Sequence, residues 1–183
     1  MSDRSQEDRS FIMTSTDETS STEPTGRGML WVVAQIPLLL LAILLPVVQH
    51  RTGRQRQWPT RIAPLARALG LLGLGVSVVI FWDASRVLGK GLVPYPRPPE
   101  GAVLRTTGVY ARARHPIYLG IIVAVASWGL LWNSVTGLVA SIPCTVFFWL
   151  KSRYEERYLE ARFADYSEYR RRVHGLVPWP KGE

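Results

Sequence analysis

The sequence predicts an all-α protein, a multi-pass bundle of about four transmembrane helices whose last two form a short hairpin, followed by an amphipathic C-terminal helix. Two observations support this prediction. Long uncharged apolar runs alternate with polar segments, and the 155 residues after position 28 hold 19 basic residues against 8 acidic ones, gathered in the polar segments. An ordinary soluble domain would spread its charges along every helix. The pattern therefore argues against a soluble globule.

The first 28 residues form a segment of their own, with six acids against three arginines and many Ser and Thr residues. Such a composition buries too little apolar surface to offset the entropy of ordering, so we expect a disordered acidic tail over 1–28. The chain then divides into 29–61, a first transmembrane span with a basic loop, and 62–183, the core of the protein.

Two apolar runs predict the first two spans. Met29–Val48 has Gln35 as its one strongly polar residue and reaches roughly 30 Å as a helix, the thickness of a bilayer's hydrocarbon. Ala63–Trp82 is the second. Its small residues form two pairs spaced four apart, Ala66 with Gly70 and Gly73 with Ser77. Such pairs let another helix approach closely. Alternatively, they belong to a glycine-rich helix that faces lipid.

The second half of the chain predicts a hairpin between polar segments. Residues 83–116 carry a proline-dense stretch that favours an extended or turning chain. Ile117–Leu150 is apolar apart from a break at Asn133-Ser134, which gives two short helices. Residues 151–173 are rich in charge and predict the amphipathic helix.

The distribution of charge also predicts an orientation and a type of partner. With four spans, both termini and the 83–116 segment share one face, which holds 17 of the 22 Lys and Arg residues. The positive-inside rule places that face in the cytoplasm of a cell-membrane protein. The basic charge points to anionic lipid rather than nucleic acid, and the single cysteine, Cys144, excludes a cysteine-based zinc site.

A hairpin over 117–150 brings its two polar ends together. Ionisable residues this close to membrane depth are costly, which indicates function. The alternative is structural, with arginines binding lipid phosphates and glutamates neutralising them. The residues at the hairpin mouth are Tyr110, Arg112, Arg114, His115, Tyr118, Lys151, Arg153, Glu155 and Glu156.

The stretch LRTTGVYARARHPIYLG over 104–120 contains the pattern R-H-P-x-Y-x-G, and Glu155-Glu156 follows beyond the hairpin. Together they resemble the isoprenylcysteine carboxyl methyltransferases and the related phospholipid N-methyltransferases. The resemblance covers roughly 62–180 and marks 62–183 as a membrane methyltransferase core. Ala164 stands where that family usually has Gly.

The resemblance implies that S-adenosylmethionine binds at the hairpin mouth. Positions that match cofactor contacts are Leu104, Tyr110, His115, Pro116, Ile117, Tyr118 and Glu155. His115, Arg114 and Glu156 are the catalytic candidates: His115 or Glu156 can remove a proton, and Arg114 can match the cofactor carboxylate. Lys151 falls where the eukaryotic enzymes place a substrate-binding arginine, and Arg153 joins it as a substrate-binding candidate. His115 can alternatively be structural, donating to a carbonyl beside Pro116.

The resemblance implies methyl transfer to a lipophilic small molecule or prenylated substrate in contact with membrane lipids. Its first implication is O-methylation of an isoprenylcysteine-like or isoprenoid carboxylate. A phospholipid amine methyltransferase is the nearest alternative, and a reductase of the steroid-reductase type with a nicotinamide cofactor is more distant. A non-catalytic protein that binds lipid or a partner also stays open. The chain has no G-x-G-x-x-G motif after a strand, so a soluble Rossmann domain is not available to hold the cofactor.

Overall fold

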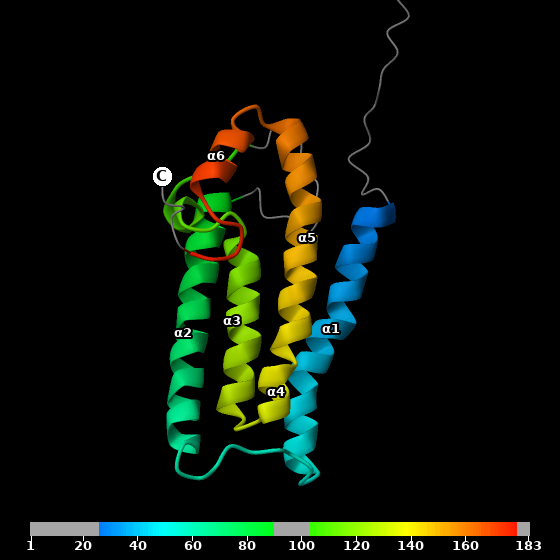
Figure 1. Ribbon diagram of the computed structural model, residues 1–183, viewed down its shortest axis with the longest axis vertical. Coiled ribbons are helices and arrows are strands. Elements are labelled where there is room, and N and C mark those ends of the chain that lie inside the picture. The colour runs from blue at the N-terminus through cyan, green and yellow to red at the C-terminus, as the bar shows by residue number, and fades with distance from the viewer. Residues whose placement is uncertain (1–25, 90–102, 179–183) are drawn as a thin grey trace, which may run out of the picture.

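The computed structural model describes residues 26–89 and 103–178, and these residues form a helical bundle (Figure 1). Within these ranges, pairing of the β type is limited to two isolated bridges, Gln57 with Ser134 and Ala113 with His174. In chain order the helices are α1 (Gly26–Arg51), α2 (Ala63–Leu88), the 3-10 helix η2 (Gly108–Ala111), α3 (Pro116–Leu131), α4 (Val135–Val139), α5 (Ser141–Arg162) and α6 (Tyr166–Arg172).

Helices α1, α2, α3 and α5 run along the long axis of the molecule (Figure 1). The connection between α1 and α2 lies at one end of the bundle, and α6 lies at the other, which we call the α6 end. Three segments are long and apolar enough to cross a membrane, Gly28–Arg51, Ala63–Leu88 and Val135–Arg162, and α3 is a shorter apolar helix. The predicted all-α bundle of about four spans is confirmed.

Helix α1 contains Pro37 and Pro46 and continues through both. A proline inside a helix removes one backbone hydrogen bond and crowds the preceding turn, which bends the helix. Figure 1 shows the part of α1 nearer the α6 end leaning away from α5. Much of the surface of α1 is exposed and apolar, with Leu40, Leu41 and Leu44 among the exposed side chains. This surface suits contact with lipid.

The small residues of α2 lie against α3. A methyl group added at Gly70 would come within 2.7 Å of the backbone nitrogen of Leu131 and 2.8 Å of the carbonyl oxygen of Ser127. One added at Gly73 would collide with the Ser127 hydroxyl. The Ser77 hydroxyl donates to the Gly120 carbonyl at 2.8 Å. These residues of α2 therefore form a helix contact surface, and not a lipid-facing one.

The predicted break at Asn133-Ser134 is the turn between α3 and α4. Asn133 adopts a left-handed conformation with a φ of 55°, which Asn tolerates better than most residues. The Ser134 hydroxyl caps α4 by accepting from the backbone nitrogen of Gly137 at 3.0 Å. The chain thus reverses within a few residues, and α5 returns it to the α6 end.

The C-terminal helix differs from the prediction. Residues 151–162 continue α5 without a break, so the last apolar span and the charged segment form one helix. The helix ends where Phe163 adopts an extended conformation and packs against a cluster of Tyr166, Tyr169 and Val173. The prediction of one continuous amphipathic helix over 151–173 was wrong, because the chain turns back after Arg162, where this aromatic cluster forms.

Two other boundaries also moved. Helix α2 extends six residues past the predicted end at Trp82, and α1 begins at Gly26, within the predicted tail. The rest of the expected disordered tail and the proline-dense stretch lie outside the described residues. The division into 1–28, 29–61 and 62–183 remains a prediction.

We expect Gly70→Ala to destabilise the protein by about 1–3 kcal/mol, because the added methyl group meets rigid backbone atoms of α3. Gly75→Ala is the matched control on the same helix: nothing lies within 4 Å of its added methyl group, so stability should stay the same or rise by about 0.5–1 kcal/mol. Thermal unfolding in detergent measures both. Equal stability of the two variants would contradict the close α2–α3 contact.

Candidate active site

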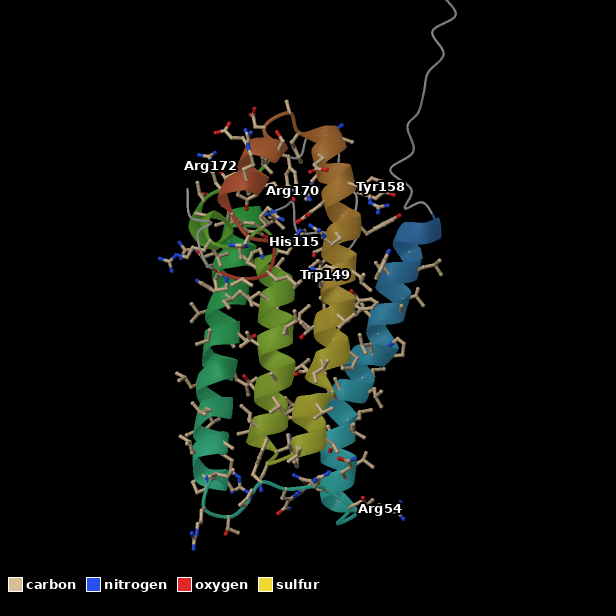
Figure 2. All side chains as sticks on the ribbon, in the orientation of Figure 1. Arg54, His115, Trp149, Tyr158, Arg170 and Arg172 are labelled. Atoms are coloured by element: carbon tan, nitrogen blue, oxygen red, sulfur yellow. The ribbon has the colours of Figure 1, made fainter. Side chains whose placement is uncertain are left out.

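The candidate site lies at the α6 end, where α3 begins and α5 passes α6. Figure 2 shows His115 and Arg170 reaching into the space between these elements. Each dipeptide that the sequence singled out, Arg114-His115 and Glu155-Glu156, contributes both of its side chains here. The site is built from segments that are about forty residues apart in the chain.

The backbone before α3 is pinned to the C-terminal segment. The backbone nitrogens of Arg114 and His115 donate to the carbonyls of His174 and Gly175, each at 2.9 Å. This pairing follows from the ends of two helices: Val173 leaves α6 in an extended conformation, and Pro116 begins α3. The two segments are therefore held side by side where their side chains meet.

The Arg114 guanidinium is buried, and each of its three nitrogens donates a hydrogen bond. Nε and Nη2 donate to Glu156 Oε1 at 3.1 and 2.5 Å, and Nη1 donates to the carbonyls of Arg170 and Val173. The side chains of this ion pair are 5% and 4% exposed. A planar guanidinium can bind a carboxylate and two carbonyls together because its donors form a fixed fork. Arg114 thus ties the start of α3, α5 and α6 together.

Glu156 is surrounded by basic groups. Besides Arg114, its second oxygen lies 3.7 Å from Arg153 and 3.7 Å from Arg170, and Nε2 of His115 lies 3.4 Å from Oε1. The Arg153 side chain is 52% exposed, so its contribution is screened by solvent. Arg170 also pairs with Glu160, and this contact raises the pKa of Arg170 above its usual value.

Glu155 has a different environment, although it is the next residue in the chain. The Tyr118 hydroxyl donates to its Oε1, and Nδ1 of His115 lies 3.7 Å from its Oε2. No arginine of the described residues lies within ion-pairing distance of it. The ring of His115 stacks on that of Tyr118, with centroids 5.6 Å apart and planes 4° apart. Nε2 of His115 is buried and makes no hydrogen bond with any described residue.

Lys151 lies one turn before Glu155 on α5, farther from the α6 end. It is 1% exposed, and its Nζ donates to Oε1 of Gln35 on α1 at 2.8 Å. Nζ also lies 5.1 Å from the centroid of the Tyr118 ring. Tyr118 therefore contacts Glu155 with its hydroxyl and Lys151 with its ring face.

The 3-10 helix η2 closes the site on the side of α2. The backbone nitrogen of Val109 donates to Asp83 Oδ2 at 2.7 Å, and Gly108 beside it has a φ of 60°. The Tyr169 hydroxyl donates to the carbonyl of Tyr110 at 2.6 Å. Burial raises the pKa of Tyr110 to about 12, with the Glu155 carboxylate adding to the effect. Tyr110 is thus a neutral, buried phenol at physiological pH.

A sequence profile of phospholipid methyltransferases matches residues 65–166, more than half of the chain. The chain belongs to the phospholipid methyltransferase family. The matched range begins in α2 and ends at the first residue of α6, so it contains every site residue named above that lies on α3 and α5.

Individual relatives are similar over part of their length. The protein-S-isoprenylcysteine O-methyltransferase of Schizosaccharomyces pombe is 38% identical over 42% of this chain and 33% of its own. The methanethiol S-methyltransferase of Mycobacterium tuberculosis is 38% identical over 39% of this chain and 29% of its own. The cobalt-zinc-cadmium resistance protein CzcN of Cupriavidus metallidurans is 28% identical over 69% of this chain. The chain spans 55% of that protein's length, and the described residues hold no group of three or more His, Cys, Asp or Glu that could bind a metal ion.

Five of the eleven residues predicted for the site form one connected group. Arg114 pairs with Glu156, His115 lies beside both glutamates, and Tyr118 donates to Glu155. Other predicted residues lie around this group. Leu104 packs against the aromatic cluster of α6, Pro116 is buried at the start of α3, Ile117 is half-buried beside it, Lys151 lies deeper, and Arg153 is at the exposed rim.

Sequence reasoning missed several residues that shape the site. Asp83 and Tyr169 hold η2, and the Arg170 carbonyl accepts from Arg114. Gln35 was noticed only as the polar residue of an apolar span. The sequence holds a signal for Asp83 and for Gln35. Asp83 is the one acid between residues 29 and 99, and Gln35 is a polar side chain within an apolar span, which needs a partner.

Arg114→Met should destabilise this family member by about 3 kcal/mol, because it leaves the buried Glu156 carboxylate without its nearest partner. Adding Glu156→Met should recover much of that loss, since the double variant buries no unpaired charge. The control is Arg172→Met, whose partner Glu168 is 59% exposed, with an expected change under about 1 kcal/mol. Thermal unfolding of the four proteins measures these effects. A double variant less stable than Arg114→Met would contradict the conclusion that the Arg114–Glu156 ion pair joins the start of α3 to α5.

Proposed function

We propose that this protein is a membrane methyltransferase that uses S-adenosylmethionine and methylates a carboxylate on a lipophilic acceptor. The observation that carries the proposal is the pairing of the buried His115 side chain with the half-buried carboxylate of Glu155. Glu155 has a tyrosine and a histidine for neighbours, while Glu156 is bound by arginine. Membership of the phospholipid methyltransferase family and the methyltransferase activities for which its relatives are named support the proposal.

The residues present suit this cofactor. S-adenosylmethionine carries an ammonium group, a sulfonium cation and a ribose diol, and a buried carboxylate binds such donors through charge-assisted hydrogen bonds. Glu155 offers lone pairs that no arginine of the described residues engages, and Nε2 of His115 lacks a hydrogen-bond partner among them. The rings of Tyr118 and Tyr110 offer faces to a cation. We propose that these four residues hold the cofactor, with Leu104, Pro116 and Ile117 packed around them.

Arg114 takes a different role in this proposal from the one its sequence position indicates. Its guanidinium donates to Glu156 and to two backbone carbonyls, so we assign it to positioning and not to the carboxylate of the cofactor. Glu156 is likewise a positioning residue, because three arginines face it. His115 remains the candidate to take a proton where the acceptor carries one.

The chemistry needs little from the protein beyond placement. When bound, the cofactor supplies a methyl group that passes to a carboxylate oxygen as the carbon–sulfur bond breaks, leaving a thioether and a methyl ester. A carboxylate is already ionised at neutral pH, so no general base is required. The side chains at the α6 end position the reactants and exclude water, which are the largest contributions available to such a transfer.

The buried Lys151 favours a carboxylate acceptor over the alternatives. An ammonium that is 1% exposed attracts an anion and repels a cationic amine, so it suits an acid better than a phospholipid amine. An apolar acceptor can reach this depth from the bilayer. Two relatives are named as O-methyltransferases of protein S-isoprenylcysteine, which is a lipophilic acceptor. We propose further that the α6 end faces the cytoplasm, on the strength of its basic residues.

The direct test is methyl transfer from isotope-labelled S-adenosylmethionine to membrane lipid extracts, with mass spectrometry of lipids that gain one CH₂ group. A base-labile ester product supports the proposal. A labelled amine would point to phospholipid N-methylation, and a volatile thioether formed from added methanethiol would point to thiol methylation. The absence of any labelled product, together with NADPH consumption, would favour a reductase.

Glu155→Gln should lower the affinity for S-adenosylmethionine by about ten- to a hundredfold, because the substitution removes a charge-assisted hydrogen bond while keeping the shape of the side chain. Glu168→Gln, the same change at an exposed position on α6, should bind as the unchanged protein does. Isothermal titration calorimetry on detergent-solubilised protein measures both. Equal affinity in Glu155→Gln would leave a non-catalytic lipid-binding or partner-binding role as the better account.

A further inference from the structure

Asp83 is the one acidic residue of α2, a helix long and apolar enough to cross a membrane. It is half-buried and lies five residues before the helix ends at Leu88. None of the ion pairs among the described residues includes it, and its partner there is the backbone nitrogen of Val109, which donates to Oδ2 at 2.7 Å. An acid within a membrane span is costly, so its presence needs an explanation other than the stability of the span.

The contact between Asp83 and Val109 requires a glycine at position 108. Gly108 has a φ of 60°, in the left-handed region that favours glycine. A methyl group added there would come within 2.8 Å of Cγ2 of Val87 and 3.0 Å of Oδ2 of Asp83. The start of η2 therefore lies directly against the face of α2 that carries Asp83, and a charge-assisted hydrogen bond holds it there.

The side chain that η2 contributes to the site is Tyr110. It is 8% exposed, and the Glu155 carboxylate adds to the rise in its pKa, so the phenol lies in the field of that carboxylate. The Tyr169 hydroxyl donates to the carbonyl of Tyr110 from the side of α6. The short helix is thus fixed at two neighbouring residues, by α2 at Val109 and by α6 at Tyr110.

We propose that Asp83 is a positioning residue for the cofactor: by holding η2 against α2, it keeps the ring of Tyr110 at the cofactor site. This inference rests on the proposed function, in which Tyr110 and Glu155 belong to the group that holds S-adenosylmethionine. Asp83 itself touches neither the cofactor nor the acceptor. It acts through the order of η2.

The expected effect follows from the population of the conformation that can bind. A protein whose η2 leaves α2 for part of the time binds the cofactor with an affinity reduced by the fraction that is in place. Saturating cofactor restores η2 to its place, because a ligand shifts the population toward the conformation that binds it. Loss of the Asp83 contact should therefore raise the KM for the cofactor and leave kcat nearly unchanged.

A purely structural role for Asp83 is the competing explanation, and it predicts a different pattern. If the contact served only to stabilise the bundle, its loss would lower the thermal stability and leave the cofactor affinity of the folded protein unchanged. In the proposed role, Asp83→Leu removes a charge from a membrane span, so thermal stability is kept or rises while cofactor affinity falls.

Three variants test the contact from both of its sides. Asp83→Leu removes the acceptor, whereas Asp83→Asn keeps an oxygen that can accept from the Val109 nitrogen. Gly108→Ala pushes η2 away from α2 and leaves both hydrogen-bonding groups present. The control is Asp165→Leu, the same replacement at an exposed aspartate just before α6, whose side chain makes no capping hydrogen bond.

The experiment uses the full chain in nanodiscs. Hydrogen–deuterium exchange of peptides that cover 104–113 measures the order of η2, and isothermal titration calorimetry measures the affinity for S-adenosylmethionine. Transfer of labelled methyl groups to membrane lipid extracts gives the KM for the cofactor and kcat. Thermal unfolding gives the stability of each variant.

We expect Asp83→Leu and Gly108→Ala to weaken S-adenosylmethionine binding by about tenfold, which is the scale of one hydrogen bond to a charged group. Exchange over 104–113 should be faster in both, and kcat should change by less than about twofold. Asp83→Asn should recover most of the affinity, and Asp165→Leu should bind as the unchanged protein does. Unchanged affinity in Asp83→Leu, or a lower kcat at an unchanged KM, would overturn the inference.

A double-mutant cycle tests whether Asp83 acts through Tyr110. Tyr110→Leu removes the ring that Asp83 is proposed to position. Adding Asp83→Leu to that variant should weaken cofactor binding by less than about twofold more, because the two changes remove the same interaction. Losses of affinity that simply add would show that Asp83 acts by another route, and the inference would fail.

Failure of the proposed function gives a different result. In that case the unchanged protein does not bind S-adenosylmethionine and the inference falls with the function, although Asp83→Leu still exchanges faster over 104–113. If the unchanged protein binds the cofactor and transfers its methyl group, and Asp83→Leu binds it equally well, the inference fails while the function stands. Where Asp83→Leu does not fold, Gly108→Ala decides by the same comparison of affinity with exchange.

Discussion

The buried pair of Arg114 and Glu156 is the interaction on which the α6 end depends. It joins the start of α3 to α5, and the same guanidinium donates to carbonyls at the end of α6. Because each partner has a direct neighbour in the chain, fixing this pair also fixes His115 beside Glu155, with 3.7 Å between Nδ1 and Oε2. A costly buried ion pair thus determines the position of the two residues proposed to meet the cofactor.

Adjacent glutamates on one helix point in directions about 100° apart, so they meet different surroundings. Glu156 faces arginines from three segments, whereas Glu155 faces a tyrosine and a histidine. The carboxylate of Glu156, which faces three guanidinium groups, stabilises the fold. The carboxylate of Glu155 accepts one hydrogen bond from a phenol, so it has lone pairs left for a ligand. The two residues therefore divide structure from binding, although the sequence presents them as an equivalent pair.

The apolar runs and the R-H-P motif were enough to predict the helices, the turn at Asn133 and the grouping of His115 with Glu155, because spans and hairpins bring chain ends together by length alone. They were not enough to place Phe163 or Gln35. The turn at Phe163 depends on an aromatic cluster that forms only when α6 folds back. The partner of Gln35 is 116 residues away, a pairing that no local pattern encodes.

The helix α5 passes from the membrane into the charged α6 end without a break, so one face of it presents Lys151 and Glu155 at successive depths. In the proposed arrangement a polar cofactor approaches from the aqueous side and a lipophilic acid from the bilayer, and Tyr118 lies between them. The Lys151–Gln35 hydrogen bond joins α5 to α1, whereas the Arg114–Glu156 pair joins the start of α3 to α5 and α6. The link between α1 and α5 is therefore made by different residues from the ion pair that positions His115 beside Glu155.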